Sequence, residues 1–213
     1  LRAGSNYDYL AFEQDLMAYI KDSMIEVKET ALWQSDIGGG GGLNLIQYDG
    51  FNRIIDDGIA STINGNPTAI TVATGITTSN IIGIMDGMWS LLPSKLKAKK
   101  DVEFMMGSDT FDKLIIALKN ANMFHYDGVN GTPYESGELV LPGTGYKVSR
   151  YFGLDSTNRI YLTRTENMVI GTDLESDEDY FDIRENPITK TLMIDIHFKE
   201  GTQVKFLNVI IRF

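Results

Sequence analysis

The densest group of side chains that could bind a metal or transfer protons is an acidic segment near residue 180. Its members are Asp173, Glu175, Asp177, Glu178, Asp179, Asp182 and Glu185. Carboxylate oxygens are the ligands that Ca²⁺ prefers, but the helix–loop–helix calcium loop needs Gly at its sixth position and Glu at its twelfth. Counted from Asp173, these positions hold Glu178 and Arg184. The segment is therefore interpreted as a solvated acidic stretch beside a strand.

Other residue types that carry chemistry are scarce. The chain has no Cys, which excludes disulfides, thiolate zinc sites and cysteine nucleophiles. Of its two histidines, His197 falls on the polar phase of a strand and His125 in a long loop, and neither belongs to a catalytic motif. The glycine run at 38–42 lacks the Lys-Ser/Thr of a phosphate-binding loop and is interpreted as a connector. We predict no catalytic, cofactor-binding or metal site.

The first element is predicted to be a long amphipathic helix over residues 8–33. Its apolar residues recur every three or four positions and form one stripe, which consists of Phe12, Leu16, Ile20, Met24, Val27 and Ala31. At 1.5 Å per residue this helix is about 39 Å long. We therefore expect it to cross the whole molecule.

The remaining pattern changes from helices to strands along the chain. A short helix or turn is expected through Asp57, a helix from Ser79 to Leu92, a buried strand at 101–106 and a helix capped by Ser108. After a long loop at 122–145, a period of two predicts strands at 146–151, 159–164, 168–171, 181–185, 191–198 and 204–211. The Glu200-Gly201 turn predicts a hairpin of the last two strands. Helices followed by antiparallel strands indicate an α+β fold.

Composition limits the class of protein. The chain has 213 residues, 43% of them hydrophobic, which is typical of a globular protein. Its net charge of −10 disfavours a broad nucleic-acid-binding face. The lysines at 95, 97, 99 and 100 are interpreted as a solvated surface segment, since no aromatic residues are interleaved with them. No apolar run is long enough to span a bilayer, and no signal peptide is visible.

The order of segments resembles the major capsid proteins of tailed bacteriophages, which have the HK97-like fold. Residues 101–114 (DVEFMMGSDTFDKL) are similar to the family's strand–turn–helix segment, and Leu92-Pro93 ends a helix at the expected place before it. Gly145–Val148 and Met168–Gly171 are similar to two of its strands, and 190–213 resembles its terminal strands. The helix at 8–33 resembles its spine helix.

This resemblance implies a fold, a function and partners. Residues 1–66 and 173–205 are expected to form a peripheral domain with the spine helix, and residues 67–172 and 206–213 an axial domain with antiparallel strands. The implied function is self-assembly into pentamers and hexamers of an icosahedral shell around double-stranded DNA, without sequence-specific binding. His125, Tyr126, Asn130 and Tyr134 are the expected loop at the capsomer axis.

Further expectations follow from the same resemblance. Scaffold, portal or decoration proteins are expected partners. The location is the virion capsid, with assembly in the host bacterial cytoplasm. The chain is also expected to be the folded core of a longer protein, without the family's N-terminal arm and extended loop.

Two alternatives stay open on the residues alone. A carbohydrate-binding or other surface interaction module would show a row of exposed aromatic residues on one sheet face. A metal-assisted enzyme would bring Asp177, Asp179 or Asp182 together in a pocket.

Overall fold

The structure is a computed structural model. It describes residues 6–39, 42, 45–60, 68–70, 75–99, 101–122, 139–172, 180–186, 189, 191–197 and 199–213. Side chains are described over the same ranges, except at 6–14, 60, 68–69, 180–186, 191–192 and 194–197.

Most of the described helices lie in the first 120 residues. They are α1 (Asn6–Gln34), α2 (Phe51–Ala60), α3 (Ile81–Leu91), α4 (Ser94–Lys97) and α5 (Ser108–Asn120), with short 3₁₀ turns η2 (Phe152–Leu154), η3 (Thr165–Asn167) and η5 (Leu207–Val209) further on. The helices predicted from sequence are present within a few residues of their expected ends. Ser108 is the first helical residue rather than the cap, because the carboxylate of Asp155 accepts a hydrogen bond from its N–H at 2.5 Å.

A six-stranded sheet forms the centre of the body. Its strands are β1 (Thr68–Ala69), β2 (Val102–Met106), β3 (Leu139–Val140), β4 (Lys147–Arg150), β5 (Ile160–Arg164) and β10 (Ile211–Arg212). Their order across the sheet is β1-β10-β5-β2-β4-β3. Strands β2 and β4 are parallel, as are β1 and β10. The prediction of antiparallel strands was wrong for these two pairs. Helix α5 lies between β2 and β4 in the chain, and a crossover of this kind permits parallel pairing, whereas β1 and β10 come from distant parts of the sequence.

Strand β2 is the centre of the core because all five of its residues are buried. The side chains of Phe104 and Met106 join the larger cluster, which helices α3 and α5 cover through Met85, Met88 and Leu114. Met105 belongs instead to a second cluster, with the C-terminal end of α1 and with α2. The sheet therefore separates two apolar layers.

Four further strands form two separate ribbons. Strand β6 (Met168–Thr172) pairs with β9 (Glu200–Val204), and β7 (Tyr180–Asn186) with β8 (Thr191–His197), both antiparallel. The predicted hairpin of 191–198 with 204–211 was wrong. The side chain of Asn167 hydrogen bonds both the N–H and the carbonyl of Phe206, at 2.7 and 2.9 Å. This contact ends β9, and β10 then joins the central sheet.

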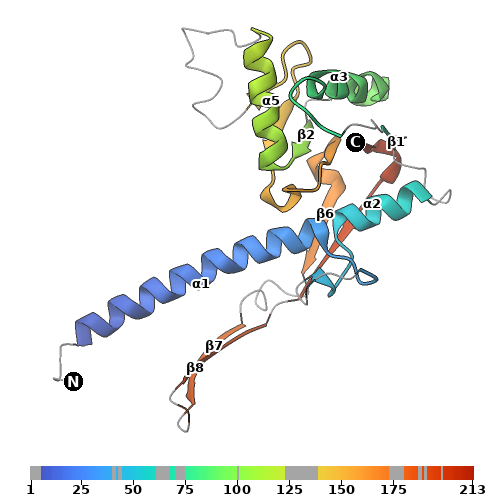
Figure 1. The fold of residues 1–213 in the computed structure, drawn as a ribbon. Helices are drawn as coiled ribbons and strands as arrows, with labels where there is room; N and C mark the ends of the chain where they lie inside the picture. Colours follow the sequence, from blue (N-terminus) through green and yellow to red (C-terminus); the bar gives the residue numbers. More distant parts are fainter. Residues whose placement is uncertain are drawn as a thin grey trace.

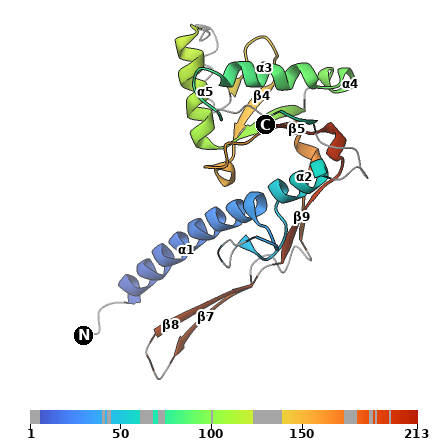
Figure 2. The same ribbon diagram turned by 45° about the vertical axis from the view of Figure 1, so that its right-hand side comes forward.

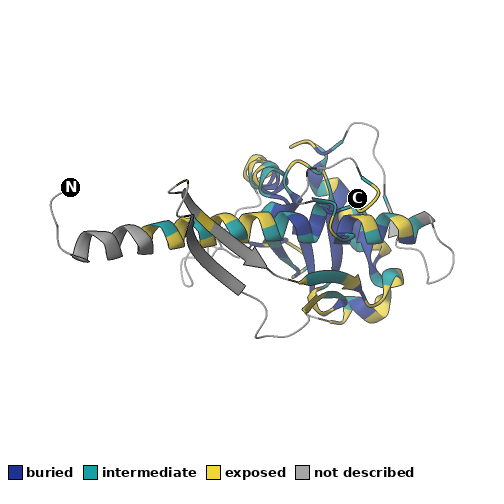
Figure 3. Cartoon of the chain, turned by 90° about the horizontal axis from the view of Figure 1, so that it is seen from below, coloured by how far each residue is buried: buried dark blue, intermediate teal, exposed yellow. Residues whose placement is uncertain are grey.

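The ribbon views show a body with two projections. Helix α1 runs away from the body toward its N-terminal end, and the β7–β8 ribbon projects on the same side (Figures 1 and 2). The C-terminus lies at the central sheet (Figure 1). Burial along α1 is confined to the end that meets the body, and the described turns nearer the N-terminus carry intermediate and exposed residues (Figure 3).

Candidate functional site

Among the described residues of the predicted apolar stripe of α1, full burial is reached at one end only. Ala31 is buried, whereas Leu16, Ile20 and Met24 are partly buried and Val27 is 39% exposed. The side chain of Phe12 lies outside the described residues. The main contacts of α1 are with η2 and α2, which meet its C-terminal turns. Most of the stripe is therefore available to another surface.

An aromatic cluster fixes α1 to the body. Trp33 is 4% exposed. Its ring centroid lies 5.3 Å from that of Phe51, 5.4 Å from that of Tyr151 and 5.7 Å from that of Tyr161. These partners come from α2, the segment after β4, and β5. One side chain on the helix thus contacts three other parts of the fold.

Close backbone packing adds to this junction at η2. A methyl group built on Gly153 would lie 2.4 Å from the carbonyl oxygen of Glu29 and 2.5 Å from Cδ1 of Trp33. The Gly153 N–H donates to the carboxylate of Glu29 at 3.3 Å, and the Gln34 amide donates to the Gly153 carbonyl at 2.7 Å. The absence of a side chain at Gly153 lets the helix come this close.

The Glu29 carboxyl at this junction is predicted to be sensitive to pH. Burial raises its pKa above the ordinary value, and the nearby charge of Asp155 adds to this effect, while the N–H groups of Gly153 and Phe152 oppose it. A carboxyl with a raised pKa in the folded state opposes folding once it is ionised. Glu29→Gln keeps an acceptor for Gly153 and removes the charge. We expect a higher thermal midpoint than the unmodified protein at pH 7.

The advantage of Glu29→Gln should disappear as the pH falls toward the ordinary carboxyl pKa of 4.5 and Glu29 becomes protonated in both states. Thermal unfolding measured at several pH values between 7 and 4 tests this. An advantage that is constant over the whole range would contradict the assignment.

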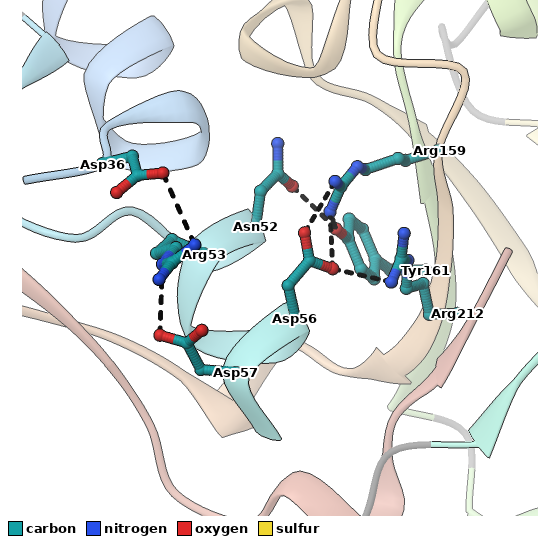
Figure 4. A network of polar contacts seen from close by, with 8 residues as sticks. All are labelled: Asp36, Asn52, Arg53, Asp56, Asp57, Arg159, Tyr161 and Arg212. Atoms are coloured by element: carbon teal, nitrogen blue, oxygen red, sulfur yellow. Dashed lines mark hydrogen bonds and ion pairs between the residues drawn. The ribbon is translucent and has the colours of Figure 1, made fainter. Parts of the chain in front are cut away.

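A second polar junction ties α2 to the central sheet (Figure 4). The Asp56 carboxylate accepts hydrogen bonds from both terminal nitrogens of Arg159, at 3.0 and 2.7 Å, and forms an ion pair with Arg212 at 2.6 Å. The hydroxyl of buried Tyr161 donates to Asn52 at 2.7 Å, and burial raises the pKa of that hydroxyl to about 12. The group joins α2 to β5 and β10.

A polar cavity of about 310 Å³ lies beside this junction, lined by residues 34–36 and by Asn52, Arg53, Asp56, Thr157 and Arg159. Arg53 also pairs with Asp57 at 3.1 Å and with Asp36 at 3.7 Å. Two aspartates and two arginines line the cavity, so it carries no excess of either charge.

Asp56→Asn tests how much the second junction contributes to the free energy of unfolding. Hydrogen bonds to a charged partner contribute about 1.5 to 3 kcal/mol each, so we expect a loss of about 2 kcal/mol in the free energy of unfolding. The matched control is Asp57→Asn on the same helix, where the pair with Arg53 is exposed and a loss of about 0.5 kcal/mol is expected. Urea unfolding of both variants provides the measurement, and equal losses would contradict the account.

One buried carboxylate lies within the central sheet. Glu103 on β2 is 8% exposed and accepts hydrogen bonds from Ser149 at 2.8 Å, Thr165 at 2.9 Å and Tyr151 at 3.1 Å. Burial and the neighbouring Glu103 charge raise the pKa of Tyr151, so its hydroxyl stays a donor at neutral pH. Three hydroxyl groups therefore satisfy Glu103, and they join β2 to β4 and η3.

Several residues singled out by the sequence lie outside the described part of the chain. These are the loop residues His125, Tyr126, Asn130 and Tyr134, and the side chains of the acidic segment at 173–185 and of His197. Among the described residues, no three His, Asp or Glu side chains are grouped as metal ligands would be. Among the same residues, no helix is long and apolar enough to cross a membrane.

Sequence reasoning missed both junctions of α1 and α2 with the body. Trp33 lies at the end of the predicted helix, and nothing in the sequence distinguishes it as an anchor. Asp56 looks like any exposed residue of an amphipathic helix. The high apolar contrast of 51–60, with Phe51, Ile55 and Ile59 on one side, was the available signal that α2 packs against a core.

Comparison with known proteins gives results at the level of structure. No family model matches the chain, and no curated protein matches it by sequence. Among solved structures, the satellite phage P4 procapsid including size determination (Sid) protein matches with a TM-score of 0.56 and 13% identity, over 97% of this chain and 69% of that one. The cyanophage A-1(L) capsid asymmetric unit matches with a TM-score of 0.57 and 10% identity, over 94% and 68%.

The chain has a phage capsid fold. A chain from Mycobacterium phage Che8 matches in the same way, with a TM-score of 0.51 and 9% identity, over 98% of this chain and 63% of that one. The match of nearly the whole chain confirms the α+β capsid fold that the order of segments indicated. This chain spans about two thirds of the length of each of these three chains.

Proposed function

We propose that this protein is a shell subunit of a tailed bacteriophage or prophage, which assembles into pentamers and hexamers of an icosahedral capsid around double-stranded DNA. The observation that carries the proposal is α1 itself. In a chain with a capsid fold, a helix of 29 residues leaves the body, and among the described residues of its apolar stripe only Ala31 is fully buried. In an assembly, a neighbouring subunit can cover such an exposed apolar stripe.

The proposed division into domains has support from the pairing of strands. All six strands of the central sheet lie within 67–172 and 206–213, the proposed axial domain. Helices α1 and α2 and the β7–β8 ribbon lie within 1–66 and 173–205, the proposed peripheral domain. The β6–β9 ribbon links the two. We propose that the loop with His125, Tyr126, Asn130 and Tyr134 reaches the capsomer axis.

The acidic character of the chain is compatible with a container for DNA. With a net charge of −10, the subunit repels the phosphate backbone rather than binding it tightly. Scaffold, portal or decoration proteins are proposed as further partners, with assembly in the host bacterial cytoplasm and the virion as the final location.

Ile20→Asp tests the role of the α1 stripe. Because Ile20 is only partly buried in the single chain, we expect the variant to fold with a thermal midpoint within a few degrees of the unmodified protein, while assembly measured by light scattering is lost. The control is Ile116→Asp, which makes the same substitution at a 48% exposed isoleucine of α5 and should assemble normally. Normal assembly of Ile20→Asp would contradict the proposal.

A further inference from the structure

An acidic face lies about 120° around α1 from the apolar stripe. Asp15, Tyr19, Asp22 and Glu26 recur at intervals of four, three and four residues and therefore lie along one line of the helix. All four are exposed, and Tyr19 is 72% exposed. The line spans about 17 Å. No other described residue forms a hydrogen bond or ion pair with the side chains of Asp15, Asp22 or Glu26.

A cluster of the opposite charge lies at the end of α3 and on α4. Residues 93–100 contain four lysines and no acidic residue, in a chain with a net charge of −10. Lys95 and Lys99 are exposed, and Leu91 beside them is 49% exposed. Lys97 lies over the Trp89 ring at 4.7 Å and donates to the Ser90 carbonyl. Lys95, Lys99 and Leu91 are therefore the side chains that this corner presents.

The two surfaces lie at opposite ends of the molecule. Figure 2 shows α1 running away from the body on one side and α4 at the far end of α3 on the other. A surface at one end that complements a surface at the other is the arrangement of a heterologous contact, which closes into a ring when the rotation between copies allows it.

We propose that the acidic face of α1 (Asp15, Tyr19, Asp22 and Glu26) in one copy binds the lysine corner (Leu91, Lys95 and Lys99) of the next copy around a ring. This contact rests on the proposed function, since it supplies one of the interfaces between shell subunits. It uses a face of α1 separate from the apolar stripe, so two faces of the helix are engaged in the assembly.

Charge and exposed apolar surface together favour a second copy as the partner. Each surface pairs charges of one sign with an exposed apolar side chain, Tyr19 among carboxylates and Leu91 among lysines. Tyrosine at the centre of complementary charges is typical of protein interfaces. DNA phosphates would attract the lysines but would repel the acidic face, so DNA accounts for only one of the two surfaces.

Charge reversal tests the contact in the protein expressed from its complete gene. One variant carries Lys95→Glu and Lys99→Glu, a second carries Asp22→Lys and Glu26→Lys, and a third combines all four changes. The altered side chains are exposed, so circular dichroism should show an unchanged fold. We expect the concentration needed for assembly, measured by light scattering, to rise roughly tenfold in each double variant and to return close to its original value in the combined variant.

The other outcomes overturn the contact in distinguishable ways. If either double variant assembles like the unmodified protein, or if the combined variant does not recover, these surfaces do not meet. If the lysine variant assembles normally but its particles lose DNA, the corner binds nucleic acid instead. If the unmodified protein forms neither rings nor shells, the proposed function fails together with the contact.

Discussion

Gly153→Ala is expected to cost about 3 kcal/mol in the free energy of unfolding. The new methyl group would lie 2.4 Å from the carbonyl oxygen of Glu29 and 2.5 Å from the ring of Trp33. A helix carbonyl cannot rotate away, so either α1 or η2 must shift. The backbone of Gly153 does not lie in the left-handed region, so the loss comes from contact with α1 and not from the conformation of the new residue.

Urea unfolding followed by circular dichroism measures this loss, and Gly83→Ala is the matched control. Gly83 is an exposed position within α3 where an added methyl group meets nothing within 4 Å. Because alanine favours helix, Gly83→Ala should gain about 0.5 to 1 kcal/mol. A loss at Gly153 of less than about 1 kcal/mol would show that α1 is not packed against η2 as described.

Trp33→Ala is expected to cost about 3 to 5 kcal/mol, the range for removing a large buried aromatic side chain. Trp33 contacts Phe51, Tyr151 and Tyr161, which come from three different parts of the fold. Its removal leaves a cavity where α1, α2 and the central sheet meet. Besides the lower stability, we expect α1 to lose its fixed orientation relative to the body. Assembly should therefore fail even below the unfolding temperature.

The control for Trp33→Ala is Trp89→Ala, because these are the two tryptophans of the chain. Trp89 on α3 is only partly buried, and Lys97 lies over its ring. A loss of about 1 to 2 kcal/mol is expected there. Equal losses at both positions, in urea unfolding, would contradict the role of Trp33 as the anchor of α1.

The sequence predicts the long helix and strand β2 well because their patterns are local. The stripe from Leu16 to Ala31 repeats with the helical period, and residues 102–106 form a short apolar run between a lysine segment and a helix. The order of such local segments was enough to indicate the capsid fold, although sequence identity to the similar capsid structures is only 9 to 13%.

Pairing between distant segments could not be predicted in the same way. The alternation at 204–211 reads as one strand, yet the side chain of Asn167, 39 residues earlier, takes the hydrogen bonds of Phe206 and separates β9 from β10. Asp56 on α2 pairs with Arg159 and Arg212, and both arginines lie more than 100 residues later in the sequence. Such contacts depend on the complete fold and leave no local periodic pattern.

The central claim is that the protein builds shells. Electron microscopy of the protein expressed from its complete gene, purified at concentrations high enough for assembly, tests it most directly. The account predicts closed particles of uniform diameter built from rings of five and six subunits, absent in Ile20→Asp and present in Ile116→Asp. A folded protein that stays monomeric at every concentration and forms neither rings nor shells would contradict it.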